Sequence, residues 1–131
     1  MTEIANLSTG EIVDYAPVSP LELEMLIREI GARLETAVPV IKRLWADRYA
    51  TERKFIEERA KAMLRSKEDT VTLRRAEADL ASLPYKHEFD TAKEILHAAE
   101  ELQKALTAKL YGFLNLNKVQ ATAYQVGGIA R

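Results

Sequence analysis

The chain contains no cysteine among its 131 residues, which excludes disulfide frameworks, thiolate nucleophiles and cysteine-ligated zinc. No apolar run approaches the roughly 20 residues that a membrane-spanning helix needs. The first residues, Met1-Thr2-Glu3, lack the basic and then apolar order of a signal peptide. The formal net charge of -1 gives no global field that would attract nucleic acid. We therefore expect a cytoplasmic protein that does not enter a membrane.

Groups that carry out catalysis are also scarce. The sequence has no glycine-rich phosphate loop, no nucleophile elbow and no histidine near a candidate serine. Glu94 and His97 form a Glu-x-x-His pair, the spacing found in di-metal helix bundles, but such a site needs a second pair. The only other histidine, His87, has a proline three residues before it. We expect no enzyme activity, no metal site and no cofactor.

What the chain does contain is apolar residues at helical spacing. Apolar residues make up 47% and charged residues 30%, which indicates a globular or coiled-coil chain rather than a disordered one. The pattern predicts an all-α fold, a long antiparallel helical hairpin resembling a coiled coil, with an additional N-terminal helix and a flexible N-terminal arm. The expected segments are a flexible or docking arm over 1–18, helices over 20–37, 39–65, 70–83 and 88–126 with a hairpin tip at 66–70, and a tail over 127–131. Residues 19–126 would form a single domain.

The boundaries follow from local signals. Ser19-Pro20 with Glu22 three residues after the serine is typical of a capping box. Pro39 should end or kink the first helix, and Pro84 should kink or split the helix that returns from the tip, around residues 82–86. The pair Gly127-Gly128 should close the last helix. Ile12, Val13 and Tyr15 make the arm a candidate docking segment.

Two apolar stripes are expected to form the packing surfaces. The second helix carries Ile41, Trp45, Tyr49, Ile56, Ala60 and Met63, with Phe55 beside the stripe, and we expect core positions for Trp45 and Tyr49. The last helix carries the strongest pattern, predicted as an oligomerisation and helix-packing seam of Ala92, Ile95, Ala99, Leu102, Leu106, Leu110 and Phe113. A bare hairpin of two helices buries little apolar surface, so we expect either that the helix over 20–37 folds back to make a three-helix core or that two chains pair. The regular seam favours the second alternative, a homo-oligomer.

Charge is segmented along the chain. Residues 42–67 carry nine basic and four acidic groups, whereas residues 68–101 carry four basic and nine acidic groups. In a hairpin these segments lie side by side, so we favour the interpretation that their charges select helix pairing and register. The alternative is a face for single-stranded DNA, with Arg43, Arg48, Arg53, Lys54, Arg59 and Lys61 as its candidate residues.

The segment Leu64–Ala78 resembles the hairpin tip of small coiled-coil proteins encoded by phages and prophages of Gram-positive bacteria. Leu64-Arg65-Ser66 matches the helix end, and Thr70, Val71, Arg74 and Ala76 match the start of the next helix. Lys67 is an insertion relative to that pattern, and Asp69 stands where glycine is expected, so the turn differs. The layout of the helices matches over roughly residues 39–116.

The resemblance implies a phage accessory protein acting in the host cytoplasm, with no activity of its own. We therefore expect a non-enzymatic adaptor or inhibitor that binds a host or phage protein. A DNA-binding accessory of phage recombination or replication is the alternative, and a structural component of the virion is the third interpretation.

Overall fold

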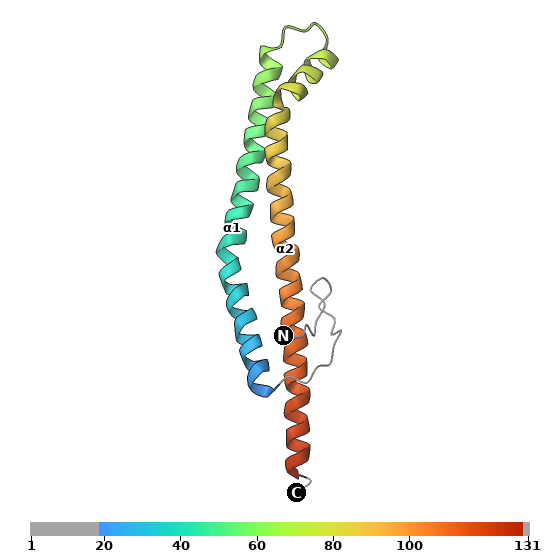
Figure 1. Ribbon diagram of the computed structural model, residues 1–131. Coiled ribbons are helices and arrows are strands. Elements are labelled where there is room, and N and C mark those ends of the chain that lie inside the picture. The colour runs from blue at the N-terminus through green and yellow to red at the C-terminus, as the bar shows by residue number, and fades with distance from the viewer. Residues whose placement is uncertain (1–18, 130–131) are drawn as a thin grey trace. The chain divides into compact units, whose positions relative to one another are not determined.

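The computed structural model describes residues 19–129, with side chains described up to residue 123. Two helices make up this part of the chain, α1 (Pro20–Arg65) and α2 (Val71–Ile129), and the loop between them spans residues 66–70 (Figure 1). No strand occurs among the described residues. The predicted all-α helical hairpin is confirmed. Residues 1–18, with Ile12, Val13 and Tyr15, lie outside the described residues.

Side-chain caps define both helix starts. The Ser19 Oγ accepts a hydrogen bond from the Glu22 backbone N–H at 3.1 Å, and Glu22 Oε2 accepts one from the Ser19 N–H at 3.4 Å. This is the reciprocal capping box that the sequence predicts. At the start of α2, Thr70 Oγ1 accepts a hydrogen bond from the Leu73 N–H at 3.2 Å. Both caps satisfy backbone donors that have no partner inside their helix.

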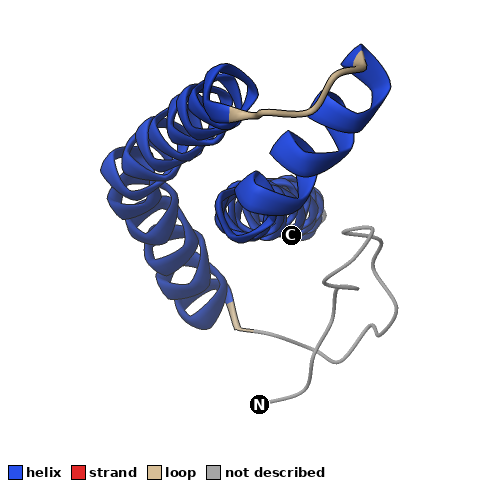
Figure 2. Ribbon diagram, turned by 90° about the horizontal axis from the view of Figure 1, so that it is seen from above, coloured by secondary structure: helices blue, strands red, loops and turns tan. Residues whose placement is uncertain are grey.

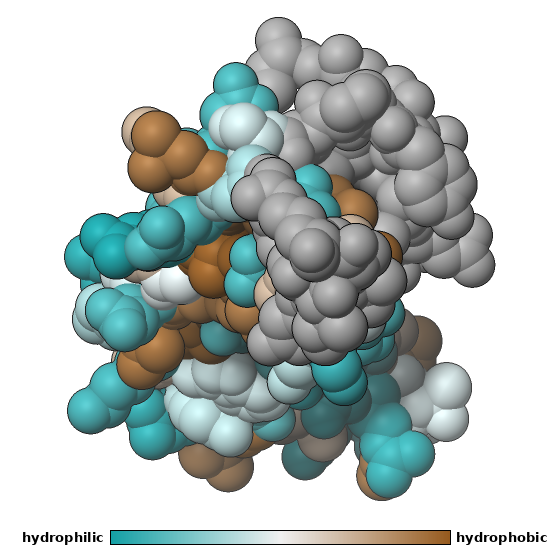
Figure 3. All heavy atoms as spheres, turned by 90° about the horizontal axis from the view of Figure 1, so that it is seen from below, coloured by the Kyte–Doolittle hydropathy of each residue, from teal (hydrophilic) through white to brown (hydrophobic). Residues whose placement is uncertain are grey.

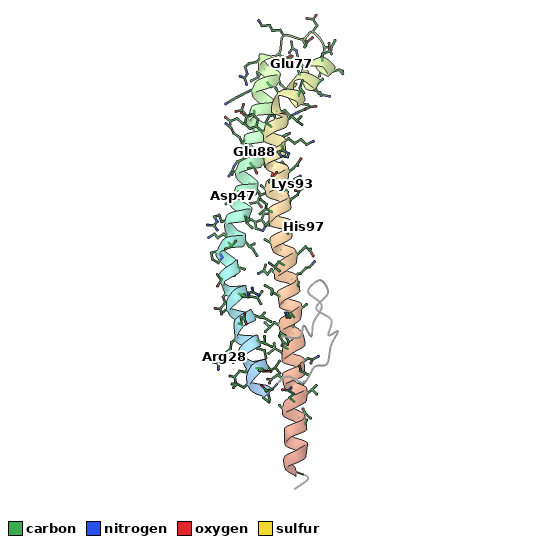
Figure 4. All side chains as sticks on the ribbon, viewed as in Figure 1. Arg28, Asp47, Glu77, Glu88, Lys93 and His97 are labelled. Carbon is green, nitrogen blue, oxygen red and sulfur yellow. The ribbon has the colours of Figure 1, made fainter. Side chains whose placement is uncertain are left out.

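The loop is fixed by hydrogen bonds to Ser66, which is 9% exposed. Its Oγ donates to Glu77 Oε2 at 2.7 Å and accepts from the Glu68 N–H at 3.3 Å. Glu77 lies in the first turns of α2, near the loop, in Figure 4. The Arg74 Nε donates to the Glu68 carbonyl oxygen at 2.7 Å. The loop is therefore bonded to Ser66 at its start and to Arg74 of α2 after its end.

The prediction of separate helices before and after each proline is wrong, whereas the kink predicted as the alternative is present in α2 (Figure 1). Pro39 lies inside α1, which is one helix over the two segments 20–37 and 39–65. The additional N-terminal helix is therefore the first part of α1. A proline keeps a φ compatible with a helix, and the loss of one hydrogen bond, about 3 kcal/mol, is offset by packing on both sides of it.

Pro84 likewise lies inside α2, which continues where the sequence suggests two helices. The first turns of α2 bend away from the direction of the turns that follow, as Figures 1 and 2 show. Pro84 cannot donate to the Leu80 carbonyl, which is an established cause of such a bend. At the other end, α2 continues through Gly127 and Gly128 to Ile129 instead of ending at the glycines. A glycine costs a helix only about 1 kcal/mol, so it does not force an end.

The chain forms two compact units, each containing parts of both helices. The terminal unit consists of Met1–Val38 and Glu100–Arg131, and the hairpin unit consists of Pro39–Ala99. The terminal unit contains a core cluster of buried Leu23, Ile30, Leu106 and Phe113, with Leu26, Ile27, Leu34, Leu110 and Leu116 packed against it. Fully burying a side chain of this size contributes roughly 1.5–3 kcal/mol.

The hairpin unit has a thinner interior. Its buried residues are Ala78, Ser82 and Leu96, with exposed fractions of 2% or less, together with Ser66. Ser82 donates its hydroxyl to the Ala78 carbonyl at 2.7 Å, within its own helix. Small side chains at Ala78 and Ser82 let the helices approach closely, while Phe55 and Phe89 fill the space further along, with ring centroids 6.4 Å apart.

The continuity of α1 predicts the effect of replacing Pro39. We expect Pro39→Ala to stabilise the protein by about 2 kcal/mol, because alanine restores the backbone hydrogen bond to the Glu35 carbonyl. Gly31→Ala is the reference substitution, since nothing lies within 4 Å of the added Cβ, and should contribute about 1 kcal/mol. Urea unfolding followed by circular dichroism measures both. A loss of stability in Pro39→Ala alone would show that the protein requires the proline.

A larger side chain at position 82 tests whether the two helices lie close together at Ser82. We expect Ser82→Leu to destabilise the protein by about 1–3 kcal/mol through overpacking. Ser82→Ala, which only removes a hydrogen bond within one helix, should change stability by less than about 1 kcal/mol. Equal stability of the leucine and alanine variants in thermal unfolding would contradict the packing described here.

Candidate interaction surfaces

The predicted seam of the last helix is divided between covered and exposed positions. Leu106 and Phe113 are buried in the core of the terminal unit, and Leu110 packs against that core. In the same unit, Leu102 is 58% exposed. In the hairpin unit, Ala92 and Ala99 are half-buried, whereas Ile95 is 51% exposed. Leu106, Leu110 and Phe113 therefore pack within the chain, against α1.

The stripe predicted for the second helix is turned away from the middle of the hairpin. Tyr49 is 50% exposed, Ile56 is 57% exposed and Ala60 is exposed, while Trp45 and Met63 are half-buried. We call these five residues the Trp45 stripe. Ile41, the sixth predicted member, is half-buried. The expected core positions thus form a largely exposed apolar flank of α1.

The contact between the two phenylalanine rings accounts for this rotation. Phe55, placed beside the stripe by the sequence pattern, contacts Phe89 across the hairpin unit. Successive residues of a helix are about 100° apart, so turning Phe55 toward α2 turns Ile56 to the side. Periodicity shows which residues share a face of α1. Which face is covered depends on the residues of α2 that pack against it, here Phe89.

Aromatic and cationic groups cluster at one end of the stripe. The Trp45 and Tyr49 ring centroids are 5.6 Å apart, and the Arg48 guanidinium lies 5.0 Å from the centroid of the indole. Such a cation–π contact contributes roughly 0.5–1 kcal/mol at an exposed site. The Arg48 Nε is buried and has no hydrogen-bond partner, so part of this side chain acts as packing material.

Charges of both signs border the Trp45 stripe. Glu52 and Arg53 form no ion pair within the described part of the chain. Arg59 Nε contacts Asp79 Oδ1 at 2.7 Å, and Lys61 Nζ contacts Glu57 Oε1 at 2.9 Å. The border of the stripe is therefore not a basic surface.

The six candidate DNA-binding residues do not share one face. Arg43, Arg53, Lys54 and Lys61 are exposed, whereas Arg48 and Arg59 are half-buried. The neighbours Arg53 and Lys54 point about 100° apart around the helix.

Ion pairs neutralise part of this basic set. Lys54 lies 3.1 Å from Glu58, and Lys61 contacts both Glu57 and Glu58. These carboxylates belong to α1 itself, and Arg59–Asp79 is the one ion pair between the two helices among the described residues. The charged residues of segment 42–67 thus pair mainly with each other within α1. Only the Arg59–Asp79 pair joins this segment to residues 68–101.

Two of these exposed groups have shifted pKa values. The hydrogen bond from Lys61, followed by the Lys61 charge, lowers the pKa of the Glu57 carboxyl below its ordinary value. The hydrogen bond to Glu58 raises the pKa of the Lys54 ammonium. Both shifts favour the charged forms of the paired groups.

Other candidate groups show no built site. Glu94, His87 and His97 are exposed, and no cluster of three or more metal-ligating side chains occurs among the described residues. An open hollow lined by Leu80, Leu83, Pro84, Lys86, His87 and Asp90 lies on α2, where Pro84 interrupts the hydrogen bonding of the helix.

A further surface, which the sequence pattern did not predict, lies on α2 in the terminal unit. Tyr111 and Val119 are 67% and 64% exposed, and Leu114 is 42% exposed. Lys118 and Val119 line a shallow hollow with Asn115, Thr122 and Ala123. Figure 3 shows hydrophobic side chains, in brown, at the surface among hydrophilic ones. The available signal was the absence of any acidic residue after residue 101, combined with apolar residues outside the seam.

Neither helix has a stretch, within residues 19–129, that is long and apolar enough to cross a membrane. Comparisons of the chain with protein-family models, with curated proteins and with solved structures give no match.

The pairing of Glu57 predicts a titration result. Its pKa should lie below the ordinary glutamate value, and Lys61→Gln should raise it toward that value because the donor and its charge are lost. The pairing stabilises the helix above the ordinary pKa and is lost as the pH falls through the lowered one. Carboxyl-carbon NMR titration measures both proteins. An unchanged Glu57 pKa in Lys61→Gln would contradict the ion pair.

Proposed function

We propose that the protein is a non-enzymatic interaction module whose Trp45 stripe binds a second copy of the chain. The observation that carries this proposal is the exposure of apolar residues at helical spacing on α1, with Tyr49 and Ile56 half exposed or more. Exposed apolar residues that follow one side of a helix are characteristic of a protein interface, and Glu52 is the charged residue among them. The thin interior of the hairpin unit adds a reason for association, because a second copy supplies apolar contacts that α2 does not.

The charged residues beside the Trp45 stripe favour a second copy of the chain over a nucleic acid as the partner that binds it. Glu52 and Arg53 carry opposite charges beside the stripe and form no ion pair within residues 19–123, so a second stripe can pair with both, whereas a phosphate backbone meets a carboxylate. The candidate basic residues are divided over different sides of α1, and Lys54 and Lys61, which share a side with Arg43, are paired with carboxylates. DNA binding is accordingly an outcome to be tested, and self-association is the proposal.

The biological setting comes from the resemblance of the hairpin tip. It supports an adaptor or inhibitor encoded by a phage, acting in the host cytoplasm on a host or phage protein. The homo-oligomer would then present two or more copies of the hairpin to that partner, which raises the strength of binding through multivalency.

Light scattering after size-exclusion chromatography tests the oligomer directly. We expect the protein to have a mass that is a multiple of 14.8 kDa. Tyr49→Glu with Ile56→Glu should reduce the mass to one chain, because each carboxylate would have to be buried in the interface. Ala46→Glu with Ala50→Glu adds the same two charges at exposed positions of α1 outside the stripe and should leave the oligomer intact.

Circular dichroism checks that all variants keep their helices, which is expected because the substituted residues are exposed in one chain. A single-chain mass for the unsubstituted protein at every concentration would contradict the proposal. Binding of labelled single-stranded DNA at physiological salt, lost in Arg53→Glu, would instead support the nucleic-acid interpretation.

A further inference from the structure

We propose that residues 1–18 of the chain bind an apolar and basic face of α2 in the terminal unit. This C-terminal face consists of Tyr111, Leu114, Asn115, Lys118, Val119 and Thr122. The proposal concerns a different surface from the Trp45 stripe and does not depend on self-association.

The C-terminal face is turned away from the core of its unit. Leu110, Phe113 and Leu116 pack toward α1, whereas Tyr111 and Val119 are about two-thirds exposed. The members of the face are three or four residues apart, so they follow one side of the helix. The hollow that includes Lys118 and Val119 lies on this side. The face therefore offers apolar contacts with a cation among them.

The positive charge of the C-terminal face indicates which kind of segment binds it. Residues 102–131 contain no acidic residue, and their lysines are Lys104, Lys109 and Lys118. A second copy of the same face would bring lysine against lysine, so an acidic apolar segment fits better. Residues 1–18 have this composition: they contain no basic residue, they carry Glu3, Glu11 and Asp14, and they include Ile4, Leu7, Ile12, Val13 and Tyr15.

The attachment point keeps the C-terminal face within reach of this segment. Leu23, close to the start of α1, shares the core cluster with Phe113 of α2. The distance along α2 from Phe113 to Thr122 is about 14 Å at the rise of an α-helix. Eighteen extended residues span up to about 60 Å, so the segment reaches the whole face from Ser19. Because it is tethered, its effective concentration is high and weak contacts suffice.

Carbodiimide coupling of the full chain tests the contact, because this reagent joins a carboxylate to a lysine amine only where the two touch. We expect a product between Lys118 and Glu3, Glu11 or Asp14, identified by mass spectrometry after digestion. The product should decrease at high salt. The Lys104–Glu101 pair, 3.7 Å apart, is the internal control because its product does not involve residues 1–18.

A substitution on the face makes the test specific. Val119→Asp places a carboxylate in the face and should lower the yield of the Lys118 product at least several-fold. Ala32→Asp adds the same charge to an exposed position of α1 in the same unit and should leave the yield unchanged. An equal yield in both variants, or no product from residues 1–18, would overturn the proposal.

An equal mixture of ¹⁴N-labelled and ¹⁵N-labelled chains identifies the source of the segment. We expect products within one isotope only, as binding inside a single chain requires. Products that join both isotopes would overturn the assignment to the same chain, because the occupant would then be the N-terminal segment of a second copy.

Discussion

A hairpin of two helices can cover only one side of each helix. Helices gain most of their stability from burying an apolar face against a neighbour, so each helix must present its best face to the other. In the terminal unit the faces match, and Leu23 and Phe113 are almost fully buried. In the hairpin unit the covered side of α1 is defined by Phe55, and the Trp45 stripe is left at the flank.

This constraint also defines what the sequence could predict. Elements whose signals are local were predicted: the capping box at Ser19, the tip at residues 66–70 and the all-α hairpin itself. The prediction of separate helices at Pro39 and Pro84 was wrong because a local penalty was taken as decisive, whereas packing outside the local window determines continuity. The orientation of the Trp45 stripe could not be predicted, since the facing residue, Phe89, lies 34 positions from Phe55 in the chain.

The charges have a more local role than their segmentation suggests. Lys54 and Lys61 pair with carboxylates one turn away, and the surface remains a mixture of both signs. Exposed pairs of this kind contribute little to stability, but they remove the uniform basic field that DNA binding requires. The part of α2 without acidic residues is different, because its lysines have few carboxylates of their own helix to pair with.

Trp45 provides the most direct test of the central claim that a second chain covers the exposed stripe. It is the only tryptophan in the sequence, and it lies in the stripe beside Tyr49. Its emission spectrum and its quenching by acrylamide, measured as the protein is diluted, report the covering of this surface. We predict blue-shifted, protected emission at high concentration that shifts to the red on dilution, toward the emission of the half-buried indole of a single chain. Emission from a solvent-exposed indole at all concentrations would contradict it.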